Sequence, residues 1–324
     1  MAVDRDLGVA FVRALGRRLD TGWEATAATG VRGLRLLREA SVFRTFVFTE
    51  ANPRAFEVLQ ANVAGEPRAT AVLGDGSVSP AMAPFDYVDV DPYGSPLRFL
   101  PTALAATRTG GILAVSATDM PVLAGAQPSA CHRRYGAEPV RGRLGPEGAL
   151  RILLMVLARE ARRAGRSAWP LFAYVGGHHV RAYVELRDGS RPPDPVGILD
   201  PLRWAGPRLG GSAPLGPLWL GPIVDSAIAL RLSVPGSAAR PREVARFLEL
   251  LRDDAEPLPP FYYESNVVAA SLGLPFPPAL SALSDGLRAA GFRAGRTHVR
   301  PEGLRTDAPR QTVEEIARAL VRRP

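Results

Sequence analysis

Short apolar runs alternate with helical patterns over the first 190 residues, and this alternation restricts the possible fold more than any other feature of the chain. The runs rich in β-branched and aromatic residues cover 22–30, 43–50, 69–75, 85–92 and 110–119. The helical patterns cover 5–19, 31–40, 53–63, 96–106 and 146–165. Strands separated by helices in this way predict an α/β fold with a parallel, doubly wound sheet.

Two further apolar runs, 169–177 and 180–189, follow each other closely. They predict an antiparallel hairpin at the edge of the parallel sheet. This edge distinguishes a Rossmann-like methyltransferase sheet from the sheet of a dinucleotide dehydrogenase. Apart from its aspartates, the run at 85–92 (FDYVDVDP) is apolar, as expected of a strand that is covered on both faces.

The pattern changes after residue 190. The stretch 190–197, SRPPDPVG, has the composition of a linker. Shorter helical patterns and a candidate strand then predict a smaller α+β domain that resembles a winged helix; they cover 240–253, 264–272, 277–291 and 292–299. We therefore predict two domains, 1–190 and 191–324.

Composition excludes several classes of protein. No segment approaches the roughly 18 uninterrupted apolar residues that suggest a transmembrane helix, and the first residues do not resemble a signal peptide. Cys131 is the only cysteine, which excludes an internal disulfide and a zinc site made of several thiolates. We expect a cytoplasmic protein without a metal or a membrane partner; a monomer is favoured.

The charge pattern favours a nucleic-acid partner. The net charge is +8, and all 40 basic residues are arginine. The segments 131–166 and 288–323 carry nine arginines each. Arginine binds phosphate through a planar fork of N–H donors. Genomic base composition or heat adaptation is the alternative explanation of the arginine content.

An acidic residue stands at the end of each of the first three predicted strands. These residues are Glu24, Glu50 and Asp75. The carboxyl ends of parallel strands form the edge at which ligands bind, and the turn at 28–33, with Thr29 and Gly30, leads into a helix N-terminus. This turn lacks the glycine spacing of a dinucleotide site. Together these features predict a site for S-adenosylmethionine.

The fourth strand ends in DYVDVDPYGSP, residues 86–96. Proline cannot continue a strand because it lacks a backbone N–H, so Asp91, Pro92 and Tyr93 are presented at the ligand edge. An exocyclic amine on a base is a poor nucleophile, because its lone pair is conjugated with the ring. The Asp91 carboxylate and the Pro92 carbonyl could accept hydrogen bonds from its two N–H groups while Tyr93 stacks on the base. A simple β-turn is the alternative interpretation.

Several segments resemble the tRNA (guanine-N2)-dimethyltransferase family, which modifies guanine 26. They are DVDPYGSP (89–96), SATDMPVLAG (116–125), YGAEPVRG (135–142), GPLWLGP (216–222) and RTHVRPEGLRTDAP (296–309). The resemblance implies S-adenosylmethionine contacts from Arg5, Arg32, Glu50, Asp75 and Gly76. It also implies that Asp91, Pro92 and Tyr93 hold a flipped-out guanine, and that tRNA binds to residues after about 190.

Some features depart from the family pattern. An aromatic-rich segment of the family precedes the position that matches Met1, Glu24 and Glu50 stand where aspartate is usual, and the cysteine-rich zinc insertion of some relatives is missing. A non-catalytic tRNA-binding relative is therefore one alternative. An adenine-N6 or protein-glutamine methyltransferase is another, which the single proline of DPYG disfavours.

Two further groups of residues are candidates for contact with the substrate. Asp119 ends the fifth predicted strand, next to the edge that carries Asp91. The arginines near this edge are candidates for phosphate contacts; they are Arg133, Arg134, Arg141 and Arg143.

Overall fold

Seven strands form one central sheet in the order β3-β2-β1-β4-β5-β7-β6. The computed structural model describes residues 2–189, 195–209 and 212–322. The strands are β1 (Thr21–Glu24), β2 (Thr45–Glu50), β3 (Ala69–Leu73), β4 (Phe85–Val90), β5 (Thr107–Ala117), β6 (Arg166–Val175) and β7 (Val180–Asp188). Strands β1 to β5 are parallel, whereas β7 is antiparallel to both β5 and β6. The expected parallel sheet with an antiparallel edge hairpin is confirmed.

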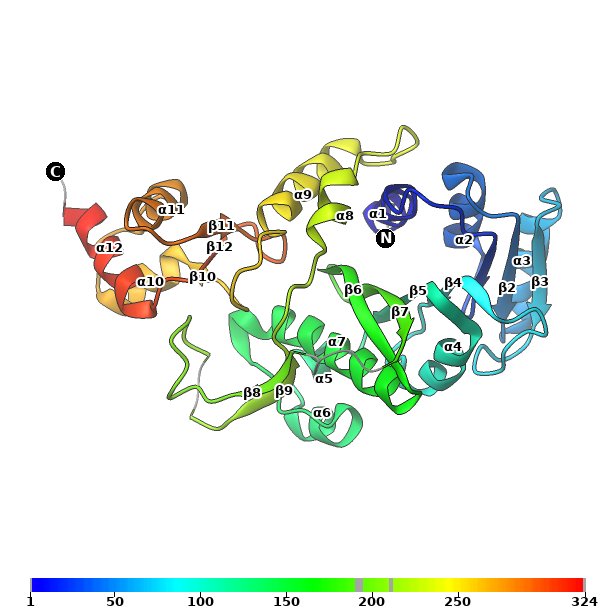
Figure 1. Cartoon of the computed structure of the whole chain (residues 1–324), viewed down its shortest axis with the longest axis horizontal. Helices are drawn as coiled ribbons and strands as arrows, with labels where there is room; N and C mark the ends of the chain where they lie inside the picture. The colour runs from blue at the N-terminus through cyan, green and yellow to red at the C-terminus, as the bar shows by residue number, and fades with distance from the viewer. Residues whose placement is uncertain (1, 190–194, 210–211, 323–324) are drawn as a thin grey trace.

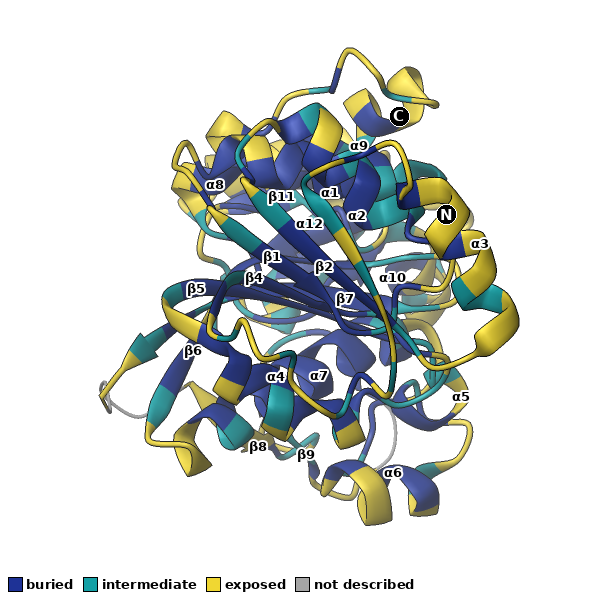
Figure 2. Cartoon of the chain, turned by 90° about the vertical axis from the view of Figure 1, so that its right-hand side faces the viewer, coloured by how far each residue is buried: buried dark blue, intermediate teal, exposed yellow. Residues whose placement is uncertain are grey.

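Helices cover both faces of this sheet, with α1 and α2 on one face and α4 and α7 on the other (Figure 2). The helices of this part are α1 (Ala2–Ala14), α2 (Val31–Arg35), α3 (Pro53–Val63), α4 (Leu100–Ala106), α5 (Met120–Leu123), α6 (Pro128–Tyr135) and α7 (Gly145–Arg163). A π-helical turn, Leu36–Ala40, extends α2, and 3-10 turns at Leu97–Phe99 and Gly142–Leu144 precede α4 and α7.

Local sequence signals explain where several elements begin and end. Helix α3 begins at Pro53 because the Asn52 side chain accepts hydrogen bonds from the N–H groups of Arg54 and Ala55, at 3.0 and 3.4 Å. The first predicted strand is shorter than expected and ends at Glu24. In the turn that follows, Ala28 has a φ of 49°, which lies outside the strand region, so the strand does not extend over the whole run 22–30.

The C-terminal part adds two small sheets and five helices to the described structure. Its elements are β8 (Val196–Leu199), β9 (Leu215–Trp219), α8 (Ser226–Arg231), α9 (Pro241–Asp253), β10 (Tyr263–Glu264), α10 (Ser265–Leu272), α11 (Leu280–Ala289), β11 (Ala294–Arg296), β12 (Gly303–Thr306) and α12 (Arg310–Arg322). The antiparallel sheet β10-β12-β11 and helices α10 to α12 form a module at one end of the molecule (Figure 1). Of the predicted linker, residues 190–194 lie outside the described residues, and Val196 and Gly197 belong to β8.

Two apolar clusters divide the buried side chains. The larger one surrounds the central sheet and includes side chains from β9, α8 and α9 as far as Tyr262. The smaller one begins at Tyr263 and ends at Ala317, inside the terminal module. The division into domains at 190/191 stays a prediction.

A buried charge network joins the terminal module to the sheet domain. The Glu147 carboxylate, on α7, accepts hydrogen bonds from Arg151 and Arg305, both at 2.7 Å. Arg305, on β12, also donates to Asp254 at 2.5 Å. The His298 ring lies 2.6 Å from Asp254 and 2.9 Å from the Ala173 carbonyl of β6. We call these residues the junction network.

The pKa of Glu147 reflects this pairing. Burial raises its pKa, but the charges of Arg305 and Arg151 outweigh burial and hold it below the ordinary value. The carboxylate is therefore ionised where no water reaches it. No helix in the described ranges is both long enough and apolar enough to cross a membrane.

Candidate active site

Acidic residues lie at or just beyond the carboxyl ends of five adjacent parallel strands. Across the sheet they follow the order Asp75, Glu50, Glu24, Asp91 and Asp119, after β3, β2, β1, β4 and β5. Because parallel strands end at the same edge, the sheet brings these residues to one side. The sequence predicted this gathering, and the strand order shows it.

Arg32 links the predicted cofactor side to the predicted base-binding side. One of its terminal nitrogens bonds the Asp91 carboxylate, and its Nε lies 4.0 Å from Glu24. Its other terminal nitrogen, Nη1, is buried and makes no hydrogen bond among the described residues. A buried donor without an acceptor is costly, so this atom marks a place where a ligand oxygen would be stabilised.

The two carboxylates beside Arg32 differ in their pKa. Burial, with the nearby Asp89 charge, raises the pKa of Glu24 to about 8. Burial also raises the pKa of Asp91, but the charges of Arg32 and Arg181 outweigh it and leave the pKa below the ordinary value. Asp91 is therefore an ionised acceptor at neutral pH.

Two backbone N–H groups fix the loop after β4 to the loops that follow β1 and β5. The Asp91 N–H donates to the Thr26 hydroxyl at 2.9 Å. Gly94 has a φ of 80°, and its N–H donates to the Thr118 hydroxyl at 2.5 Å. Pro92 is buried, while the Tyr93 side chain between these anchors is fully exposed, at 101%. The ring of Tyr93 is thus free to contact a ligand.

Glu50 organises the turn that follows β1. Its carboxylate accepts hydrogen bonds from the N–H groups of Ala28, at 2.7 Å, and Asn52, at 2.8 Å. Thr29 is exposed, and Gly30 caps α2 with a φ of 73°. The structure therefore brings Thr29, Gly30 and Glu50 together at the edge.

Asp75 and Gly76 form the corresponding loop after β3. The Asp75 carboxylate accepts from the Ser77 N–H at 2.9 Å and from Arg98 at 2.8 Å, and these partners lower its pKa. A Cβ on Gly76 would lie 1.9 Å from the Ala25 carbonyl oxygen, closer than any real contact. Only glycine lets this loop approach the β1 loop so closely.

We expect Gly76→Ala to weaken cofactor binding and to lower the free energy of unfolding by about 1–3 kcal/mol, because the Ala25 backbone cannot yield without moving the loop. Gly74→Ala is the matched control, since its Cβ would meet Thr49 at an ordinary 3.8 Å. Calorimetric titration with S-adenosylmethionine and urea unfolding test both variants. Equal behaviour of the two would show that the close approach has no role.

Arg5 is the predicted cofactor residue that comes from the first helix. It lies half-buried on α1, which packs against α2 and the π-helical turn. Its contact with a cofactor stays a prediction.

Sequence reasoning missed a buried arginine behind the site. Arg181, on β7, is fully buried and donates to Asp89 at 2.5 Å and to Ser116 at 2.7 Å. It also donates to the Tyr183 hydroxyl at 2.8 Å. The available signals were Arg181 among the apolar residues at the start of the run 180–189 and Asp89 inside the run at 85–92.

Of the other candidates, Asp119 lies at the site edge and accepts from Arg134 at 2.9 Å. Arg133 is exposed on α6. Arg143 instead bonds Glu264 of the terminal module at 2.7 Å. The described residues contain no group of three or more histidine, cysteine, aspartate or glutamate side chains that could hold a metal ion.

Comparison with known proteins places these features in one family. The sequence model described as N2,N2-dimethylguanosine tRNA methyltransferase matches residues 1–197 and 210–318. The tRNA (guanine(26)-N(2))-dimethyltransferase of Thermococcus kodakarensis is 33% identical over 98% of this chain and 91% of its own length. The enzyme of the same name from Pyrococcus furiosus is 32% identical over 98% of this chain and 91% of its own length.

A solved structure has the same fold. The complex of Trm1 from Pyrococcus horikoshii with S-adenosyl-L-methionine matches with a TM-score of 0.84 and 30% identity, over 98% of this chain and 92% of that chain. The sequence match and the shared fold agree over nearly the whole chain. The chain belongs to the N2,N2-dimethylguanosine tRNA methyltransferase family.

Proposed function

We propose that this protein transfers methyl groups from S-adenosylmethionine to the exocyclic N2 of guanine 26 in tRNA, and that it forms N2,N2-dimethylguanosine. The observation that carries the proposal is the ion pair of Arg32 and Asp91, which links the predicted cofactor residues to the predicted base-binding loop. The named relatives act as tRNA (guanine(26)-N(2))-dimethyltransferases. Such a substrate also favours a cytoplasmic location.

The residues at the edge of the sheet suit S-adenosylmethionine. The unpaired Nη1 of Arg32 offers a donor for a carboxylate. Glu50 and Asp75, at neighbouring strand ends, offer acceptors for hydroxyl and amino groups, and Gly76 allows the loop that carries Asp75 to lie against the β1 loop. The bound cofactor supplies an electrophilic methyl group.

The loop after β4 is suited to hold an amine that is about to be methylated. The ionised Asp91 carboxylate accepts a hydrogen bond from one N–H group of the guanine amine, and the Pro92 carbonyl accepts a hydrogen bond from the other. Because Arg32 and Arg181 lower the pKa of Asp91, the carboxylate holds the amine by a hydrogen bond before transfer. It would take up the N–H proton only after methylation has made the amine positively charged and acidic, and would then release that proton to solvent. The acceptors favour a nitrogen lone pair that leaves conjugation with the ring, while Tyr93 stacks on the base.

Labelled cofactor tests the proposal directly. Unmodified tRNA transcript incubated with the protein and methyl-labelled S-adenosylmethionine should carry label at position 26, up to two methyl groups per tRNA. A transcript with another base at position 26 should stay unlabelled. Label on adenine or on protein glutamine would replace the proposal with another amino-methylation. Binding of tRNA without binding of the cofactor would indicate a non-catalytic relative.

A further inference from the structure

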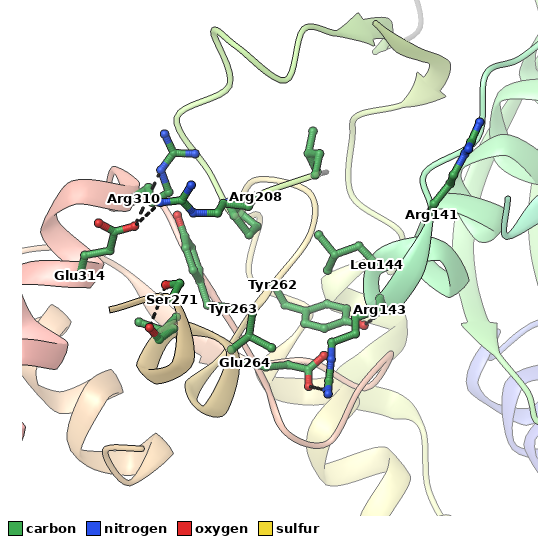
Figure 3. A pocket seen from close by; sticks show the side chains of 14 residues that line it. Arg141, Arg143, Leu144, Arg208, Tyr262, Tyr263, Glu264, Ser271, Arg310 and Glu314 are labelled. Atoms are coloured by element: carbon green, nitrogen blue, oxygen red, sulfur yellow. Dashed lines mark hydrogen bonds and ion pairs between the residues drawn. The ribbon is translucent and has the colours of Figure 1, made fainter. Parts of the chain in front are cut away.

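A pocket of about 240 Å³ lies between the sheet domain and the terminal module (Figure 3). Its wall on the sheet-domain side includes Arg141 and Arg143, around the 3-10 turn before α7, and its wall on the other side includes Tyr263, Arg310 and Glu314. Residues 207–209 complete the lining. The pocket therefore combines parts of the chain that are far apart in sequence.

The pocket carries more positive than negative charge. Four arginines line it, against two glutamates. Arg143 and Glu264 neutralise each other through a 2.7 Å hydrogen bond. The Glu314 carboxylate lies 3.5 Å from Arg208 and 4.0 Å from Arg310, which is too long for strong hydrogen bonds. These two ion pairs share one carboxylate, so Arg208 and Arg310 together keep one net positive charge and further N–H donors for an anion.

The Tyr263 hydroxyl supplies an independent indication of a ligand. Tyr263 is only 5% exposed, and its hydroxyl is buried without a hydrogen-bond partner among the described residues. Its neighbour Tyr262 donates to the Arg143 carbonyl at 2.8 Å. In Figure 3 the Tyr263 hydroxyl points towards Arg208 and Arg310. Burial raises the pKa of Tyr263, so the hydroxyl keeps its proton and can donate.

We propose that this pocket binds a backbone phosphate of the tRNA, with Arg208, Arg310 and the Tyr263 hydroxyl as the donors. Two planar guanidinium groups and one hydroxyl match the several acceptor oxygens of a phosphate. The inference rests on the proposed function, because it assumes that tRNA is the substrate. It adds a second point of contact, away from the base that is methylated.

The fold connects this pocket with the methylation site. Helix α5 begins directly after Asp119, at the carboxyl end of β5. It leads to Gly125, where a Cβ would lie 2.7 Å from the Arg141 side chain. Arg141 lines the pocket. A short, packed segment therefore joins the two sites, and one tRNA held in the pocket would have a defined position relative to Tyr93.

Tyr263→Phe tests the hydroxyl alone. We expect about tenfold weaker tRNA binding, as for the loss of one hydrogen bond to a charged group, with a thermal midpoint that is unchanged or higher. Tyr174→Phe is the matched control, because the Tyr174 hydroxyl is also buried without a partner among the described residues but lies on β6. A lower midpoint for Tyr263→Phe, or equal tRNA binding by both variants, would overturn the proposal.

The double variant Arg208→Gln/Arg310→Gln tests the charge. We expect the slope of log K against log salt concentration to fall by about one, as for the loss of one phosphate contact. The KM for tRNA should rise while kcat and cofactor binding stay unchanged. Arg18→Gln is the control, since the Arg18 side chain is 74% exposed and precedes β1. It therefore lies at the amino end of this strand, whereas the methylation site lies at the carboxyl ends. An equal slope for both variants would refute the pocket as a phosphate site.

Two further measurements separate this inference from the proposed function. If the unaltered protein binds no tRNA, the proposed function fails as well. If it binds tRNA and the pocket variants bind equally, only the pocket assignment fails. Calorimetric titration with adenosine monophosphate covers the other source of phosphate. In the absence of tRNA, we expect adenosine monophosphate to bind weakly. If it binds tightly and the double variant abolishes this binding, the pocket binds a free nucleotide instead of a tRNA phosphate.

Discussion

Asp91→Asn should lower the rate of methyl transfer by about 10²- to 10³-fold, the effect typical of losing one positioned electrostatic contact. Asparagine keeps the size of the side chain but removes the charge that accepts the guanine N–H. Because asparagine can still contact Arg32, we expect cofactor binding to change far less than turnover. Single-turnover rates with saturating tRNA measure the chemical step, and calorimetry measures the cofactor affinity.

Asp86→Asn is the matched control for this experiment. Asp86 lies on the same strand, β4, but near its amino end, where it accepts from the Thr21 N–H at 2.9 Å. We expect turnover close to that of the unaltered protein. A single-turnover rate for Asp91→Asn equal to that of Asp86→Asn would remove Asp91 from the mechanism.

Glu147→Gln should lower the free energy of unfolding by about 3–5 kcal/mol, the cost of breaking a buried ion pair by removing one partner. The glutamate is fully buried and accepts hydrogen bonds from two arginines and from the Phe261 N–H. Its loss leaves Arg151 without an anion and leaves Arg305 with Asp254 alone. Urea unfolding followed by circular dichroism measures the change.

Arg293→Gln is the control for the junction network. Arg293 belongs to the same terminal module, but its ion pair with Asp307 is exposed to solvent, and such pairs contribute little. We expect a much smaller change than for Glu147→Gln. Similar changes for both variants would show that the network does not stabilise the junction.

The sequence predicted the elements that depend on local signals. The helix at 53–63 is found as Pro53–Val63, because an asparagine cap and a proline mark its start. The hairpin of β6 and β7 follows from two apolar runs around one turn. The edge position of Asp91 follows from Pro92, which ends a strand wherever that strand lies. These features need no knowledge of distant parts of the chain.

Features that depend on distant contacts were missed. Arg181 pairs with Asp89, 92 positions away, so neither residue alone indicates a buried ion pair. Glu147 anchors Arg305, which lies 158 positions away, so neither residue alone indicates the contact. The pocket at the junction is lined by residues within 141–144, 207–209, 262–271 and 310–314, which are far apart in the sequence. Strands β8 to β10 are short, with two to five residues each, so their local patterns are weak. Helix α12 was missed although its apolar residues recur at helical spacing.

The bare ring of Tyr93 has a consequence for how substrates are chosen. Because no side chain of the described residues covers this ring, a guanine can reach it without displacing one of them. The main energetic cost of binding the base then lies in the tRNA, in which the stacking of guanine 26 on its neighbours must be broken. Discrimination among tRNAs would accordingly reflect how loosely each one holds position 26.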